Sequence, residues 1–386
     1  MLRFATSPIS DMHVSDLRVA ILNYLVARQE SEPFLVRIDD TNIQDNIIGK
    51  DTEIMMILEK FAIKHDLVFH QSEHLNLHQT LAIKLLKEGK AFICRCVNEK
   101  SCSKECKNLT QEEQIELKES KTPFVTRIDR DSTTILDREG KPTYTFAVAC
   151  DDMMSDISHI ICPEIDMVDV PIYEQIKTLL GYKKETKYSI VSTFDKDYTI
   201  KELFEEGFLP DAIINYLLLD ENPPKEIFTL PEAIEWFDLK NISKMKNQFD
   251  IDRLLLINRE HLKRIKDKEL SKLFGFADED IGKLAKLYLE EVSTIKELEE
   301  RIKAIFKPKD FTSKYGTDMK LLSDIIFDSP AFDEFAEFRE FTLKRSGLDE
   351  ERFNKALSCL LTYREDSSNL SNIYPFIKSY ILEVAS

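Results

Sequence analysis

Residues 2–18, LRFATSPISDMHVSDLR, decide how this chain begins to fold. The first part, LRFAT, is a short apolar segment that predicts a buried strand, and the strand should end in a turn at Pro8. Apolar side chains then recur at helical spacing over residues 14–29, which predicts a helix. Ser15 or Asp16 lies where a helix cap is expected.

Strand and helix patterns alternate in the residues that follow. FLVRIDD at 34–40 predicts a second buried strand that ends in acids, and helical patterns follow at 49–62 and 74–89. This order predicts a doubly wound α/β domain. Residues 90–125 interrupt it with cysteines and charges, which is typical of an insertion, and TYTFAVACDD at 143–152 predicts a further strand.

From about residue 199 onward nearly every segment has helical periodicity, and no strong strand pattern occurs after residue 250. We therefore expect an α/β domain followed by an all-α domain. The expected boundaries are 1–198 for the α/β domain, with a cysteine-rich insertion around 70–125, then a helical region at 199–250 and the all-α domain at 251–386.

The composition is that of a soluble globular protein: of 386 residues, 43% are hydrophobic and 32% are charged. No stretch approaches the roughly 20 apolar residues of a membrane helix, and MLRFATSPIS lacks the features of a signal peptide. We therefore expect a cytoplasmic protein that does not contact a membrane. The net charge of −17 disfavours a nucleic-acid partner only weakly, because a local basic face can still hold phosphates.

The 7 cysteines are an odd number in a long chain, which disfavours a disulfide framework. Four of them follow the pattern C-x-C-x5-C-x3-C, namely Cys94, Cys96, Cys102 and Cys106. Four thiolates this close together in sequence can surround a structural zinc ion, and unligated thiols in a reducing compartment are the alternative. His78 and His159 are interpreted as packing or surface residues rather than ligands.

RFATSPISDMHVSDLR, at 3–18, closely resembles the opening of bacterial glutamyl-tRNA synthetases, class I enzymes in which a strand leads to a helix start that carries the HIGH signature. Further resemblances follow in the family's order and cover nearly the whole chain. They include FLVRIDDTN at 34–42, HQTLAIKLLKEGKAFICRC at 78–96, GKPTYTFAVACDD at 140–152 and EEGFLPDAIINYLLL at 205–219.

The resemblance implies a Rossmann-like catalytic domain, stem-contact helices at 199–250 and an anticodon-binding-like domain at 251–386. It also implies an activity: glutamate attacks ATP, with Mg²⁺, to give an adenylate, and tRNA then takes the glutamyl group. The implied partners are tRNA, glutamate and ATP. The protein itself is expected to be a monomer. The family also carries zinc in its insertion, and Cys94, Cys96 and Cys106 match that site, whereas Cys102 is shifted.

The signature motifs depart from the family pattern. The HIGH position has His13-Val14-Ser15-Asp16, so a serine side chain replaces the glycine against which the nucleotide should lie, and an acid follows it. The KMSKS position falls on residues 190–194 and keeps only Ser192. Lys187 and Lys196 flank it out of register. The plain alternatives are a capped helix start and a surface loop.

The amino-acid pocket implied by the resemblance is also changed. Arg3, Ser7 and Tyr144 match family positions that hold glutamate, and Asp39 stands where a glutamate residue is usual. Cys162 stands where the family has an arginine, and a thiol cannot replace a guanidinium as a carboxylate clamp. A short β-rich stretch before residue 140 is missing as well.

Basic residues cluster in the helical region of this otherwise acidic chain. They form either a phosphate track for tRNA or a solvated helix face, and the resemblance favours the track. The residues are Lys240, Lys244, Lys246, Arg253, Arg259, Lys263 and Arg264.

Three functional hypotheses follow. The first is a synthetase-like protein that binds tRNA while ordinary glutamate–tRNA ligase activity is weak or lost. The second is an active glutamate–tRNA ligase, and the third is an enzyme of this family with another substrate. The changed motifs favour the first hypothesis, because several of the substitutions weaken the same function, the stabilisation of negative charge on the phosphates of ATP.

Overall fold

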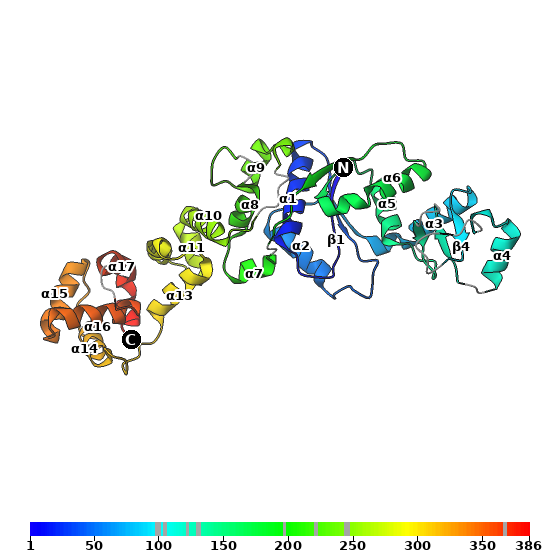
Figure 1. Cartoon of the computed structure of the whole chain (residues 1–386). Coiled ribbons are helices and arrows are strands. Elements are labelled where there is room, and N and C mark those ends of the chain that lie inside the picture. Colours follow the sequence, from blue (N-terminus) through cyan, green and yellow to red (C-terminus); the bar gives the residue numbers. More distant parts are fainter. Residues whose placement is uncertain are drawn as a thin grey trace. The chain divides into compact units, whose positions relative to one another are not determined.

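The computed structural model of the chain describes residues 1–96, 102, 106–120, 123–128, 133–195, 198–219, 223–242, 248–365 and 369–386. The chain forms two compact units (Figure 1). The first contains Met1–Lys201 and Leu217–Phe249, and the second contains Glu202–Tyr216 and Asp250–Ser386. The second unit thus takes in a short segment well before residue 250. The roles expected for the predicted domains stay predictions.

The first unit is built on a five-stranded parallel sheet in the order β3-β2-β1-β7-β8. Its middle strand is the first segment of the chain, and Leu2 pairs with Phe34 on one side and with His159 on the other. The predicted α/β fold is confirmed. The strands are β1 (Leu2–Thr6), β2 (Phe34–Ile38), β3 (Leu67–His70), β7 (His159–Pro163) and β8 (Lys187–Val191).

Helix α1 (Val14–Gln29) packs against β1 and β7, and Figure 1 shows it beside β1. Its side chains at Leu17, Ile21 and Leu25 are fully buried, as the helical spacing predicts. The helices predicted at 49–62 and 74–89 are confirmed as α2 (Lys50–Lys60) and α3 (Leu75–Lys87). Further elements are η1 (Gln71–His74), η3 (Glu164–Val168), α6 (Val170–Leu179), α9 (Leu230–Trp236) and η5 (Leu239–Asn241).

The strand predicted at 143–152 is wrong, because this segment forms helix α5 (Tyr144–Met154). Seven consecutive residues from Phe146 to Asp152 are buried in it. A segment that is apolar on all sides has no periodicity to separate a helix from a buried strand. The helix contacts α3 and α6, and these contacts account for its burial.

The cysteine-rich segment carries a small antiparallel sheet in the order β4-β5-β6. Phe92 pairs with Arg127, and Cys94 pairs with Val125. The sheet fixes Cys94 in a strand, so the first thiol of the group has a rigid support. The elements here are β4 (Phe92–Cys94), η2 (Cys106–Asn108), α4 (Gln111–Glu119), β5 (Val125–Arg127) and β6 (Thr134–Leu136).

The second unit is helical, and the described residues after 250 contain no strand, as predicted. Ile281, Leu284, Leu322 and Phe353 are fully buried in its core. Two short helices, α7 (Ile200–Glu205) and α8 (Pro210–Leu218), cross the unit boundaries. The others are α10 (Ile251–Arg264), α11 (Asp267–Leu273), α12 (Glu279–Leu287), η6 (Tyr288–Glu290), α13 (Ile295–Phe306), α14 (Gly316–Phe327), α15 (Phe335–Ser346), α16 (Glu350–Thr362), α17 (Leu370–Ile377), η7 (Lys378–Tyr380) and α18 (Ile381–Val384). Within the described ranges, no helix has the length and apolar character needed to cross a bilayer.

Candidate functional site

A buried network of two arginines and two carboxylates joins the centre of the sheet to α5. Arg3 on β1 donates from Nε and Nη2 to the two carboxylate oxygens of Asp152, at 2.6 and 2.9 Å. Arg37 on β2 donates from Nη1 to Asp152 at 2.8 Å, and from Nε and Nη2 to Asp39 at 2.6 and 3.2 Å. Asp152 therefore connects two neighbouring strands.

The network is held in its charged state by mutual compensation. Arg37 and Asp152 are each 1% exposed, so burial alone would favour the neutral carboxyl. Although this desolvation opposes ionisation, Arg3 and Arg37 lower the pKa of Asp152 to about 2. Removing one partner would leave a buried charge without its counter-ion.

A cavity of about 140 Å³ lies against this network. Of the predicted pocket residues, Arg3, Tyr144 and Cys162 line it. Asp39 does not line the cavity, but it accepts a hydrogen bond from the Tyr144 hydroxyl at 3.1 Å, and Ser7, just after β1, does not line it either. The full lining is Arg3, Ala5, Arg37, Tyr144, Val148, Ile160, Cys162, Asp166, Asp169, Val170, Tyr173 and Tyr188.

Cys162, on β7, lines the cavity, and it is the residue predicted to replace an arginine of the family. Its side chain is 7% exposed, and its Sγ lies 3.9 Å from the Met167 sulfur. Burial, with a smaller contribution from Asp166, raises the pKa of this thiol to about 11, so it is neutral at pH 7. Cys162 therefore adds no positive charge to the cavity. Two acidic residues, Asp166 and Asp169, also line it.

The N-terminus of α1 is joined to the segment that follows β8. The Val14 N–H donates to the Tyr198 carbonyl at 2.9 Å, and the Ile200 N–H donates to the Met12 carbonyl at 2.9 Å. Between these bonds, His13 and Thr199 form an antiparallel bridge. The first N–H group of the helix is thus already used, although such groups are the ones that bind phosphates at other helix starts.

Side chains at residues 13–16, the position predicted to match the HIGH signature, complete this contact. The Asp16 carboxylate accepts a hydrogen bond from the His13 N–H at 3.1 Å. The Ser15 hydroxyl accepts one from the Phe194 N–H at 3.4 Å. An acid and a hydroxyl therefore occupy the helix start, and the acid complements its dipole as an anionic ligand would.

Arg18, one turn further along α1, contacts residues of the segment 190–194, which is predicted to match the KMSKS signature. Its guanidinium lies 5.7 Å from the ring centre of Phe194, and it also contacts Ser192. The structure thus places His13 beside Thr199 and Ser15 beside Phe194, while Ser192 contacts Arg18. Lys187 lies on β8, and Lys196 is outside the described residues.

Comparison with known proteins decides the family. A family model described as "tRNA synthetases class I (E and Q), catalytic domain" matches residues 1–122 and 124–256. The chain is 50% identical to "Glutamate--tRNA ligase 2" of a Sulfurovum species, over 100% of both chains. The chain belongs to the glutamyl-tRNA synthetase family. It is also 42% identical to "Glutamate--tRNA ligase 1" of a Nitratiruptor species, over 100% of both chains.

A solved structure of the same family has the same fold. It is the glutamate tRNA ligase from Elizabethkingia meningosepticum, with its amino acid bound. It has a TM-score of 0.78 and 20% identity, and the match covers 100% of this chain and 98% of that one. The Sulfurovum alignment spans 428 positions against 386 residues here, so 42 positions have no counterpart in this family member.

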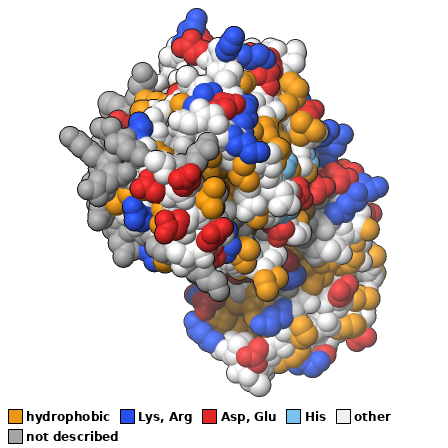
Figure 2. Space-filling model, turned by 90° about the vertical axis from the view of Figure 1, so that its right-hand side faces the viewer, with side chains coloured by type: hydrophobic (Ala, Val, Ile, Leu, Met, Phe, Trp, Pro, Cys, Tyr) orange, Lys and Arg blue, Asp and Glu red, His pale blue; other side chains and the backbone are white. Residues whose placement is uncertain are grey.

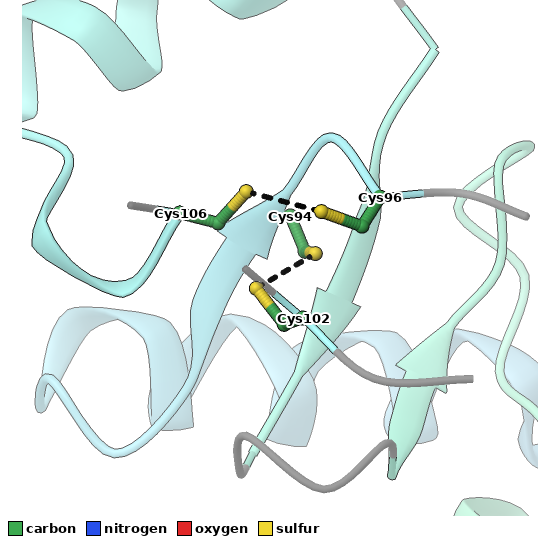
Figure 3. Close-up of side chains that lie close together, drawn as sticks. All are labelled: Cys94, Cys96, Cys102 and Cys106. Carbon is green, nitrogen blue, oxygen red and sulfur yellow. Dashed lines mark hydrogen bonds between the residues drawn. The ribbon is translucent and has the colours of Figure 1, made fainter. Parts of the chain in front are cut away.

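The four predicted cysteine ligands converge in the insertion, as Figure 3 shows. The Cys94 and Cys102 sulfurs are 3.2 Å apart, those of Cys96 and Cys106 are 3.6 Å apart, and all four lie within 4.8 Å of one another. Tetrahedral zinc with Zn–S bonds of about 2.3 Å needs sulfurs separated by roughly 3.8 Å, so the group fits this ion. Burial raises the pKa of Cys94 and of Cys102, and zinc binding would therefore release protons.

The predicted basic cluster is divided between the two units. Lys240 belongs to the first unit, and Lys244 and Lys246 are outside the described residues. Arg253, Lys263 and Arg264 are exposed on α10 in the second unit, whereas Arg259 donates to the Ser293 hydroxyl at 3.1 and 2.8 Å. On the face drawn in Figure 2, basic and acidic side chains are interspersed.

Sequence reasoning missed three residues that organise this site, Arg37, Asp152 and Arg18. All three are at most 1% exposed. A signal was present for Arg37, because an arginine inside the apolar strand FLVRI must find a buried acid. Asp152 could not be found because residues 143–152 were predicted as a strand. Only the helix that they form directs its side chain toward Arg3 and Arg37.

Proposed function

We propose that this protein is a glutamyl-tRNA synthetase-like, tRNA-binding member of its family in which ordinary glutamate–tRNA ligase activity is weak or lost. One observation carries the proposal: the start of α1 is bonded to the segment after β8, from Val14–Tyr198 to Ser15–Phe194. In this fold, ATP would need that helix start.

Both charge and space oppose the binding of ATP at this helix start. A triphosphate is stabilised by free N–H groups, by close backbone approach and by cations. Here the Val14 N–H is donated to a carbonyl, and Asp16 adds a negative charge. The described residues between Ile190 and Thr199 include no lysine, so this part of the loop supplies no phosphate cation.

The amino-acid pocket supports the same proposal. Arg3 is the cation that a glutamate side chain would be expected to meet, but two of its nitrogens already bind Asp152. Cys162 supplies no second cation. Losing a charged partner costs roughly 1.5–3 kcal/mol of binding, or a factor of about 10–150 in affinity.

The alternative is an active glutamate–tRNA ligase, which would use ATP, Mg²⁺ and glutamate. Its support is the 50% identity to a relative with that name. In both cases we propose a cytoplasmic tRNA-binding protein that is a monomer. We also propose a structural zinc ion on Cys94, Cys96, Cys102 and Cys106, held by thiolates that converge in the insertion.

The deciding experiment is ATP–pyrophosphate exchange with glutamate, with and without tRNA. The Sulfurovum relative, purified in the same way, is the positive control. We expect exchange at least about 100-fold slower than in the control, while a gel shift still shows tRNA binding at low salt. Exchange within about tenfold of the control would favour the active ligase instead.

A further inference from the structure

Two histidines converge on one buried carboxylate, away from the cysteines. His74 ends η1, His78 lies one turn further along α3, and Asp151 comes from α5. Both imidazoles approach the same oxygen: His74 Nδ1 is 2.9 Å and His78 Nε2 is 2.7 Å from Asp151 Oδ1. His78 and Asp151 are fully buried, whereas the His74 side chain is 31% exposed.

The other carboxylate oxygen is held in place. The Gln71 side-chain amide donates to Asp151 Oδ2 at 3.0 Å, and Gln71 is itself fully buried. The His74 ring packs on Phe69, with ring centres 4.4 Å apart. These contacts orient the carboxylate and one imidazole from outside, as neighbouring groups do around metal ligands.

We propose that His74, His78 and Asp151 form a second metal site, for a divalent late first-row cation of the zinc class. Two imidazole nitrogens and one carboxylate oxygen are a donor set that such ions prefer, and they leave a fourth position for water. The three donor atoms lie within 4.8 Å of one another. The set excludes a magnesium preference, because that ion favours oxygen ligands.

Metal entry requires a small movement. With bonds of about 2.0–2.1 Å, tetrahedral ligation separates donor atoms by roughly 3.3 Å. The present separations of 2.7 and 2.9 Å from Asp151 must therefore widen by about 0.5 Å. His74 lies at a helix start and is partly exposed, so it is the ligand that can move and the side from which the ion can enter.

The arrangement also sets the strength of binding. His78 Nδ1 is buried and has no hydrogen-bond partner among the described residues. When a cation takes Nε2, the ring proton moves to Nδ1 and becomes a buried donor without an acceptor there, which weakens binding. Binding should therefore be about 5- to 150-fold weaker than at a histidine site with complete outer partners. A chelator should empty it before it empties the cysteine group.

The site would join α3 to α5 beside the arginine network, because Asp151 directly precedes Asp152. Its role is thus structural, as a cross-link behind the pocket. Neither tRNA binding nor ligase activity is needed for it, so the proposal stands or falls separately from the proposed function.

The test is the zinc stoichiometry of the full chain after it has been stripped with a chelator, reloaded with excess zinc and freed of unbound metal. His74→Gln and His78→Gln keep a hydrogen-bond donor toward Asp151 but remove the imidazole. His65→Gln, at an exposed position, is the matched control. We expect each of the first two variants to bind one zinc equivalent fewer than wild type, and His65→Gln to match wild type. The difference of one holds whether or not the cysteine group binds zinc.

Cobalt gives a second readout. Co²⁺ on thiolates shows intense sulfur-to-metal charge-transfer absorption, whereas Co²⁺ on imidazole and carboxylate shows only weak visible bands. We expect a weak component that is absent in His74→Gln. If His78→Gln does not fold, judged by circular dichroism, His74→Gln decides alone. Equal zinc stoichiometry in wild type and a folded His74→Gln would overturn the proposal.

Discussion

The guanidinium of Arg18 donates from Nη1 to both the carbonyl oxygen and the hydroxyl oxygen of Ser192, at 2.8 and 3.0 Å. Arg18 is 1% exposed and Ser192 is half-buried, so these bonds are partly shielded from water. The pair connects the first helix with Ser192, the residue predicted to match the serine of the KMSKS signature. A buried bond of this kind favours a single arrangement of the two segments.

ATP binding should therefore be weak, with a dissociation constant above about 1 mM by calorimetry. Ser15→Gly should not recover it, because Val14 still donates to Tyr198 and the loop gains no cation. The Sulfurovum relative measured in the same buffer is the control. Micromolar affinity in the wild-type protein would contradict this explanation.

Asp152→Asn should strongly destabilise the protein. The substitution leaves Arg3 and Arg37 buried with one carboxylate fewer, which costs about 3–5 kcal/mol in the free energy of unfolding. Asp156→Asn is the control, since Asp156 pairs with Lys184 at an exposed position and should cost less than about 1 kcal/mol. Urea denaturation measures both, and equal effects would show that the network contributes little.

Acid should weaken the first unit through the same carboxylate. The folded-state pKa of Asp152, about 2, lies below the value of about 3.9 expected in the unfolded chain. This contribution, roughly 2–3 kcal/mol, is thus fully present above about pH 5 and is lost as the pH falls toward 2. Asp152→Asn should show a flatter decline in stability over that range. A parallel decline in both proteins would exclude Asp152 as the cause.

Cys102→Ser should abolish or greatly weaken zinc binding at the cysteine group. It removes one of four converging thiols, and the remaining three leave an open position. Cys359→Ser, outside the group, is the control. Because burial raises the pKa of Cys94 and Cys102, zinc affinity should also fall as the pH is lowered. Competition with a coloured chelator measures both effects, and unchanged zinc affinity in Cys102→Ser would remove this cysteine from the site.

Binding to tRNA should fall steeply with salt, because each neutralised phosphate releases counterions. Replacing Lys240, Arg253 and Arg264 with Ala should weaken it for all tRNA species alike and lower the salt slope by about one per lost contact. Lys303→Ala with Lys320→Ala, at exposed positions elsewhere in the second unit, is the control. No shift at low salt in wild type, or identical slopes in all three proteins, would mean that the basic cluster is a solvated face.

Much of the fold could be predicted from the sequence because its strands and helices have distinct periods. The β1–α1–β2 segment and the helical second unit follow this rule. Helix α5 does not, since Phe146 to Asp152 is buried on every side and carries no period. Tertiary contacts, which no local pattern contains, decided its conformation.

The site was predictable where a residue type has few possible uses. Four closely spaced cysteines had to lie together, and they do. By contrast, the partner of Arg3 comes from a helix 149 residues away, so the pairing depends on how α5 crosses the sheet. The sequence predicts His78 to be a packing or surface residue, because no local pattern shows that Asp151, 73 residues away, lies against it.

The bridge between His13 and Thr199 has a consequence for synthesis on the ribosome. The N-terminal strand also pairs with β7, and the Met1 carbonyl accepts the Ser158 N–H at 2.9 Å. These contacts span most of the first unit, so the first residues to be made cannot complete their bonds until Thr199 has emerged. The nascent chain must therefore remain partly open for a long interval, exposing the apolar faces of β1 and α1 to chaperones during translation.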